Sequence, residues 1–212
     1  MTTRNKVAED LLKIKAVQFS LNPAFTWASG WRSPIYCDNR KTLSHPEVRT
    51  FIRDAFVEQV RAEYPEATGI AGVATGAIAQ GALVADQLGL PFIYIRSKAK
   101  GHGMQNLIEG ALDPAGKYVV IEDLISTGMS SARAVSALLE TGATVLGTLA
   151  IFSYGFPKAK ETFNATGTSF DTLTNMQALM EEAQKIDYLR PEEKAVIESW
   201  QQAPDQWQPT EG

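Results

Sequence analysis

Hydrophobic and polar residues follow two different patterns along the chain, and the change from one to the other falls near residue 68. Before that point, apolar residues recur three or four positions apart, which predicts helices over residues 5–19 and 44–64. In the second helix, Ser44 is the expected N-cap and Pro46 stands in the first turn. Between the helices, aromatic and β-favouring residues around Ser29-Gly30 predict two short strands joined by a turn.

After residue 68, short apolar runs alternate with helical patterns. Strands are expected over residues 69–74, 91–95, 118–121 and 144–152, and helices over residues 77–88 and 130–140. The weaker pattern after residue 156 predicts a strand over 169–173, a helix over 191–199 and a loosely ordered tail from about residue 203. Near-continuous apolar strands that alternate with helices are typical of an α/β fold, with a central, mainly parallel sheet flanked by helices.

Composition and charge narrow the class of protein. A chain of 212 residues fits a single domain over residues 1–212, and a net charge of −4 argues against general nucleic-acid binding. The sequence has no run of 18 apolar residues and no apolar signal core near its start, so we expect a cytoplasmic protein without a membrane partner. Cys37 is the single cysteine, which excludes an intramolecular disulfide and a cysteine-rich metal site.

The segment richest in candidate chemistry follows the apolar run at residues 119–121. Glu122 and Asp123 come directly after this run, at the carboxyl end of a predicted strand, where open α/β sheets bind ligands. Residues 124–130 supply hydroxyl side chains and a glycine before a helix begins, and N–H groups at a helix start can bind phosphate. Because carboxylates can accept hydrogen bonds from vicinal sugar hydroxyls, this segment predicts a site for a phosphorylated sugar. The alternative is a solvated or helix-capping acidic pair followed by an ordinary turn.

Three other segments contain candidate functional groups. Residues 96–103 read Arg-Ser-Lys-Ala-Lys-Gly-His-Gly, and their cations could stabilise a departing anion, although a solvated loop has the same composition. Thr75-Gly76-Ala77 lies at a predicted strand–helix turn, where small residues are also common for packing alone. Residues 25–30 read Phe-Thr-Trp-Ala-Ser-Gly, and residues 33–36 read Ser-Pro-Ile-Tyr.

Taken together, these segments resemble a known family. Residues 119–131 are similar to the phosphoribosyl-diphosphate signature of the type I phosphoribosyltransferases. Residues 96–103, with Asn106 and Glu109-Gly110, resemble the mobile catalytic loop of the orotate phosphoribosyltransferases, and residues 25–36 resemble the N-terminal hood of that family. The resemblance runs from about residue 5 to about residue 160 and implies the type I phosphoribosyltransferase fold, with a small hood formed mainly by residues 1–45.

The resemblance also implies an activity and a set of site residues. The enzyme would transfer the phosphoribosyl group of 5-phosphoribosyl 1-diphosphate (PRPP) to orotate, giving orotidine 5'-monophosphate and pyrophosphate in pyrimidine (UMP) biosynthesis. It would use Mg2+, held through the substrate near Glu122 and Asp123, and would form a homodimer with shared active sites. The implied catalytic residues are Lys100, His102 and Asp123, and orotate would contact Phe25, Thr26 and Ser126. The residues implied in PRPP binding are Thr75, Gly76, Arg96, Lys98, Lys100, His102, Glu122, Asp123, Leu124, Ile125, Ser126, Thr127, Gly128, Met129 and Ser130.

The chain departs from some branches of the family at three places. Ser97 stands where a lysine follows the loop arginine, Ala28 where a lysine precedes the hood Ser-Gly, and residues 153–156 where an arginine follows the strand. The group that neutralises the orotate carboxylate is therefore open, with backbone amides, Arg32 and Arg40 as candidates. The alternative functions are a phosphoribosyltransferase for another base and a non-catalytic PRPP-sensing regulator. The hood and the loop argue against the first, and the negative net charge argues against the second.

Overall fold

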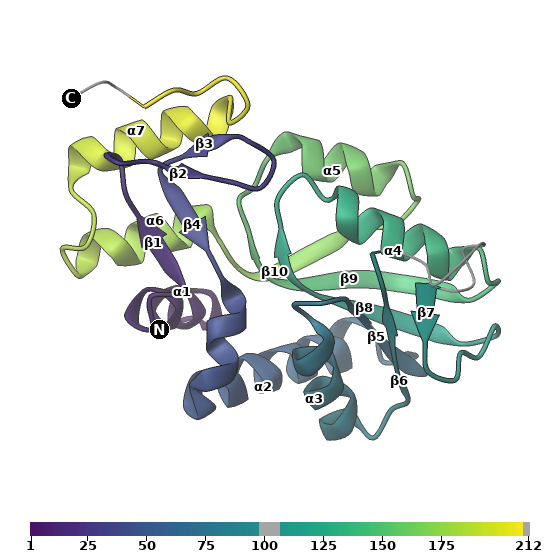
Figure 1. Cartoon of the computed structure of the whole chain (residues 1–212). Coiled ribbons are helices and arrows are strands. Elements are labelled where there is room, and N and C mark those ends of the chain that lie inside the picture. The colour runs from purple at the N-terminus through teal and green to yellow at the C-terminus, as the bar shows by residue number, and fades with distance from the viewer. Residues whose placement is uncertain (98–106, 210–212) are drawn as a thin grey trace.

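A computed structural model describes residues 1–97 and 107–209 (Figure 1). The predicted site residues Lys98, Lys100 and His102 lie outside the described residues. The N-terminal elements are α1 (Thr3–Lys13), β1 (Val17–Phe19), β2 (Phe25–Thr26), β3 (Arg32–Ser33), β4 (Ile35–Cys37), the 3₁₀ helix η1 (Asn39–Ser44) and α2 (Pro46–Glu63). They are followed by β5 (Gly69–Val73), α3 (Ile78–Leu88), β6 (Phe92–Ile95), β7 (Ile108–Glu109), β8 (Lys117–Ile125), α4 (Met129–Leu139), β9 (Thr144–Ser153), α5 (Pro157–Asn164), β10 (Phe170–Asn175), α6 (Met176–Lys185) and α7 (Pro191–Gln202).

The central sheet has the strand order β10-β9-β8-β5-β6-β7. Neighbouring strands are parallel except for the short β7, which pairs antiparallel with β6 at the sheet edge. Helices lie on both faces, with α4 and α5 on one side and α2 and α3 on the other (Figure 1). This arrangement confirms the predicted α/β fold with a central, mainly parallel sheet.

Alternate residues of β8 enter two separate hydrophobic cores. Val119 and Ile121 pack in the core that contains residues of α1, α2, α3 and α6. Tyr118 and Val120 pack in the core formed with α4 and α5. Because successive side chains of a strand point to opposite faces, a strand buried on both faces must be apolar at every position. The uninterrupted apolar run before Glu122 therefore has a direct structural cause.

The N-terminal helix is shorter than the apolar spacing predicts. α1 ends at Lys13, and Val17–Phe19 form β1, which pairs antiparallel with β4. The chain turns at Lys15, whose φ is 54°, and the Ala16 N–H donates to the Leu11 carbonyl at 2.9 Å to close the helix. The prediction of one helix over residues 5–19 is therefore wrong beyond Lys13, because the apolar spacing continues across this turn onto a strand.

The start of α2 also differs from the prediction. Ser44 ends η1, and His45 occupies the N-cap position without a side-chain hydrogen bond. The 3₁₀ helix runs directly into α2, and the His45 N–H donates to the Thr42 carbonyl at 3.1 Å. The prediction of a Ser44 cap is wrong because this extra turn precedes the helix, whereas Pro46 does begin the first turn.

The elements predicted after residue 68 are present, with shifted ends. β8 extends to Ile125, so Glu122 and Asp123 lie within the strand rather than after it. The strand predicted over residues 169–173 is β10, which runs from Phe170 to Asn175. The sequence pattern did not predict α5 or α6.

The N-terminal strands form a small unit that rests on the C-terminal helices. β1 pairs with β4, β2 pairs with β3, and α1 packs against α6 (Figure 1). Trp27, between β2 and β3, contacts Trp200 of α7 edge-on, with ring centroids 5.6 Å apart. Trp207 in the C-terminal segment is partly buried against the same core. Within residues 1–97 and 107–209, no helix combines the length and hydropathy needed to cross a bilayer.

Candidate active site

The acidic pair at the end of β8 has one buried and one partly exposed member. Glu122 is 5% exposed, and its Oε2 accepts a hydrogen bond from the Ser131 hydroxyl at 2.8 Å. Its Oε1 accepts the backbone N–H of Asp123, also at 2.8 Å. Burial, and then the neighbouring charge of Asp123, raise the pKa of Glu122 well above the usual carboxyl range. Glu122 thus joins the strand to α4 through Oε2 and binds the Asp123 backbone through Oε1.

Asp123, the other member of the pair, remains partly exposed. Its carboxylate lies against Gly76, where a Cβ would overlap the carboxylate atoms. The loop between β5 and α3 therefore brings Gly76, one of the residues predicted to bind PRPP, next to Asp123. The peptide bond between Ala74 and Thr75 is cis. Glycine at position 76 is needed because the backbone and a carboxylate approach each other so closely.

The predicted phosphate loop leads directly into α4. Ser126 and Thr127 are half-buried, while Met129 and Ser130 are exposed. Gly128 occupies the N-cap of α4 with a φ of 77°, and no side chain caps the N–H groups of this helix end. These N–H groups and the positive end of the helix dipole form an environment that favours a phosphate.

A cavity of about 360 Å³ joins the hood to this loop. Thr26 and Ser126, both predicted to contact orotate, line the cavity together. Phe25 instead packs against Tyr36, with ring centroids 5.6 Å apart. The complete lining is Thr26, Trp27, Ala28, Tyr36, Cys37, Leu124, Ser126 and Tyr154. A flat ring of a nucleobase is a suitable occupant for a cavity with aromatic walls and a few hydroxyl groups.

Sequence reasoning did not assign Cys37 and Tyr154 to this cavity. Tyr154 directly follows β9, so it lies at the same sheet edge as the acidic strand end, and this position was a usable signal. Cys37 lines the cavity from β4, and a strand of three residues is too short for its pattern to indicate which face is buried. Burial raises the pKa of the Cys37 thiol well above its usual value, so this residue is held as a neutral thiol.

A second cavity, of about 440 Å³, lies between the end of β6 and α4. Arg96 lines it together with Met129 and Ser130, so three of the residues predicted to bind PRPP meet there. The Arg96 guanidinium also contacts Glu109 of β7, with Nη1 and Oε1 3.3 Å apart. This cavity therefore offers a cation next to the N-terminus of α4.

Both arginines considered for the orotate carboxylate have partners within the chain. Arg32 donates from Nη2 to the Ala24 carbonyl at 3.3 Å. Arg40 forms an ion pair with Asp38, with Nε and Oδ1 2.7 Å apart, and this contact lowers the pKa of Asp38. Over the described ranges, no three His, Cys, Asp or Glu side chains gather in a group that could hold a metal ion.

The parallel sheet, the acidic end of its central strand and the loop that opens the following helix define a class of protein. Solved structures with this fold are type I phosphoribosyltransferases. The chain matches orotate phosphoribosyltransferase from Aeropyrum pernix with a TM-score of 0.74 and 28% identity, over 86% of this chain and 98% of that one. It matches UMP synthase from Leishmania donovani with a TM-score of 0.79 and 24% identity, over 93% of this chain and 42% of that one.

Sequence relatives identify the family within this class. Orotate phosphoribosyltransferase from Phocaeicola vulgatus is 51% identical over 209 residues, which cover 98% of this chain and 99% of that protein. No family model matches the sequence. On the strength of the full-length relatives, the chain belongs to the orotate phosphoribosyltransferase family, as its motifs predict.

Proposed function

We propose that this protein transfers the phosphoribosyl group of PRPP to orotate, giving orotidine 5'-monophosphate and pyrophosphate in pyrimidine biosynthesis. The observation that carries the proposal is that the 360 Å³ cavity, here called the base cavity, adjoins the loop that begins α4. Ser126 belongs both to the cavity wall and to the loop that begins α4. A nucleobase in the cavity and a phosphate at the helix N-terminus would therefore both lie beside this loop.

The residues of the site then have distinct roles. The Asp123 carboxylate accepts hydrogen bonds from the ribose hydroxyls, and the N-terminus of α4 binds the 5-phosphate through N–H groups and hydroxyls. In the reaction, a bond forms between N1 of orotate and C1 of the ribose, the bond from C1 to the diphosphate oxygen breaks, and the proton of N1 is released while pyrophosphate leaves. Negative charge grows on the departing pyrophosphate, and Arg96, Lys100 and His102 are the groups proposed to stabilise it.

The donor set at the strand end suits Mg2+ that arrives with the substrate. Asp123 offers a partly exposed carboxylate, whereas both oxygens of Glu122 already accept hydrogen bonds from the chain. One available carboxylate does not form a complete cage for Mg2+, which commonly keeps waters and phosphate oxygens as ligands. When bound, the cation would neutralise charge on the diphosphate.

We further propose a cytoplasmic homodimer in which Lys100 and His102 complete the site of the neighbouring subunit. The support is the resemblance of residues 96–103 to the catalytic loop of the family, which often completes the active site of the neighbouring subunit. A mixture of Lys100→Ala and Asp123→Asn subunits should regain activity, since one mixed site combines an intact loop with an intact ribose pocket. No recovery after verified subunit exchange would contradict sharing between subunits.

The experiment that tests the reaction is base-specific turnover. Orotate absorbance should fall in the presence of PRPP and Mg2+, while adenine, hypoxanthine and uracil should not be consumed. Turnover of one of these other bases would reassign the enzyme within its class. PRPP binding without turnover of any base would favour the sensing regulator instead.

A further inference from the structure

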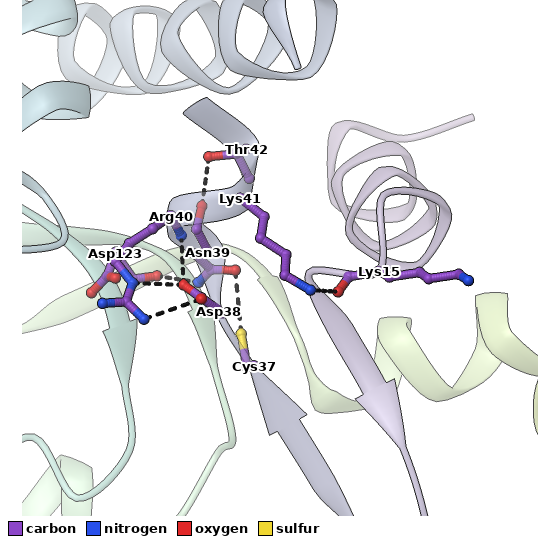
Figure 2. A network of polar contacts seen from close by, with 8 residues as sticks. All are labelled: Lys15, Cys37, Asp38, Asn39, Arg40, Lys41, Thr42 and Asp123. Atoms are coloured by element: carbon purple, nitrogen blue, oxygen red, sulfur yellow. Dashed lines mark hydrogen bonds and ion pairs between the residues drawn. The ribbon is translucent and has the colours of Figure 1, made fainter. Parts of the chain in front are cut away.

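One buried side chain joins the hood to the acidic strand end. Asn39, the first residue of η1, is 2% exposed, and its Nδ2 donates to the backbone carbonyl of Asp123 at 2.6 Å (Figure 2). Its Oδ1 accepts a hydrogen bond from the Cys37 thiol at 3.2 Å. A carbonyl oxygen can only accept, so the amide nitrogen must face Asp123 and the amide oxygen must face the thiol. Both ends of the Asn39 amide are therefore partnered.

The strand needs such support at this position. β9 pairs in register with Glu122 and Leu124, but Asp123 between them has no register partner. The pairing of β5 with β8 has already ended at Ile121. Side chains therefore bind both polar groups of the Asp123 backbone: Glu122 accepts its N–H, and Asn39 donates to its carbonyl.

We propose that Asn39 is a positioning residue for Asp123. By binding the Asp123 carbonyl, Asn39 fixes the plane of the peptide and hence the direction of the carboxylate that lies against Gly76. This inference rests on the proposed function, in which that carboxylate binds the ribose hydroxyls of PRPP. Cys37 also lines the base cavity, so the same hydrogen-bonded chain connects the wall around the base with the group that holds the sugar.

The test variant is Asn39→Leu, which keeps the size of the side chain and removes both hydrogen bonds without adding charge. The Asp123 carbonyl is then free to turn towards another donor, and PRPP must restore its orientation on binding. We expect the Kd for PRPP with Mg2+, measured by calorimetry, to rise about tenfold, the range set by one lost buried hydrogen bond. The KM for orotate at saturating PRPP should change less than about twofold, because the cavity lining does not include Asn39.

A matched control lies in the same turn. The Thr42 hydroxyl donates to the Asn39 backbone carbonyl at 2.6 Å, and Figure 2 draws no hydrogen bond or ion pair between Thr42 and Asp123. Thr42→Val should lower the unfolding temperature but leave the Kd for PRPP unchanged. If Thr42→Val weakens PRPP binding as much as Asn39→Leu does, general loosening of η1 explains the effect and the proposal is wrong.

A second pair of variants applies if Asn39→Leu does not fold. Cys37→Ala removes the donor that orients the amide, and Cys37→Ser restores a donor. PRPP binding should weaken in the alanine variant and recover in the serine variant, and equal affinities would overturn the proposal. A wild-type protein that binds PRPP but consumes no orotate contradicts the proposed function alone, and the Asn39 comparison then still decides the positioning role.

Discussion

The contact between Gly76 and Asp123 gives the sharpest test of how the site is assembled. The Gly76→Ala substitution adds one methyl group, which would overlap the carboxylate of Asp123. The carboxylate is partly exposed, so it can move away in the free protein. We therefore expect the variant to fold with nearly unchanged stability and to bind PRPP poorly.

The size of the expected loss in PRPP affinity follows from which atoms of Asp123 the new methyl group would overlap. The Oδ1 atom of Asp123 would be 2.8 Å from the new Cβ, and the Cγ and Oδ2 atoms would be closer still. Rotation about the Cβ–Cγ bond exchanges one clashing oxygen for the other, so the carboxylate must move as a whole. Overpacking of this kind costs about 1–3 kcal/mol. Because PRPP binding requires the carboxylate to return, affinity should fall about 5-fold to 150-fold.

The assay is calorimetric titration of PRPP with Mg2+ on four proteins: wild type, Gly76→Ala, Asp123→Ala and the double variant. In the Asp123→Ala background the new methyl group meets no carboxylate, so Gly76→Ala should then have little further effect. Thermal unfolding of the same four proteins checks that each is folded. Wild-type affinity in Gly76→Ala, or an equal loss of affinity in both backgrounds, would refute the reasoning.

Two further predictions concern the attachment of the C-terminal helices. Trp200 is fully buried and contacts Trp27 of the hood. Trp200→Ala should therefore destabilise the protein by about 3–5 kcal/mol and raise the KM for orotate. An unchanged unfolding temperature would contradict this prediction. The Lys185 ammonium lowers the pKa of Glu182, so this ion pair stabilises the fold above the ordinary carboxyl pKa of about 4.3 and is lost as the pH falls through the lowered pKa. Glu182→Gln should therefore cost about 0.5–1 kcal/mol at pH 7 and progressively less as the pH falls below about 4, whereas a cost that does not change with pH would exclude the ion pair as the cause.

The sequence best predicts the elements that are determined by their own pattern of apolar residues. β5, β8 and β9 are buried on both faces over most of their length, so each appears as a nearly continuous apolar run. β6 is fully buried at alternate residues only, and its run is shorter. Glu122 and Asp123 interrupt one of these runs, and the end of a parallel strand has a fixed position relative to its neighbours. The strand end and its loop could therefore be predicted without knowledge of the tertiary contacts.

The hood could be predicted only in part, because distant contacts determine it. Its strands are too short to show an alternation of apolar and polar residues. Val17 also continues the apolar spacing of α1, although it lies on β1. The support of Trp27 by Trp200 joins residues at opposite ends of the chain. Asn39 could not be assigned for the same reason: its partner Asp123 is 84 positions away, and an asparagine after a short strand is also a common turn residue.

Glu122 and Asp123 are neighbouring carboxylates, but their surroundings give them different roles. The carboxylate of Glu122 is buried against Ser131 of α4, while the carboxylate of Asp123 is partly exposed and lies against Gly76. Burial raises the pKa of Glu122 and favours its neutral form, which reduces the negative charge at the strand end. That reduction matters for a polyanionic ligand such as PRPP, because each additional fixed negative charge beside its phosphates would repel it. The buried member therefore acts on the ligand indirectly: it binds the Asp123 backbone from one side, as Asn39 does from the other, and leaves a single exposed carboxylate to face the sugar.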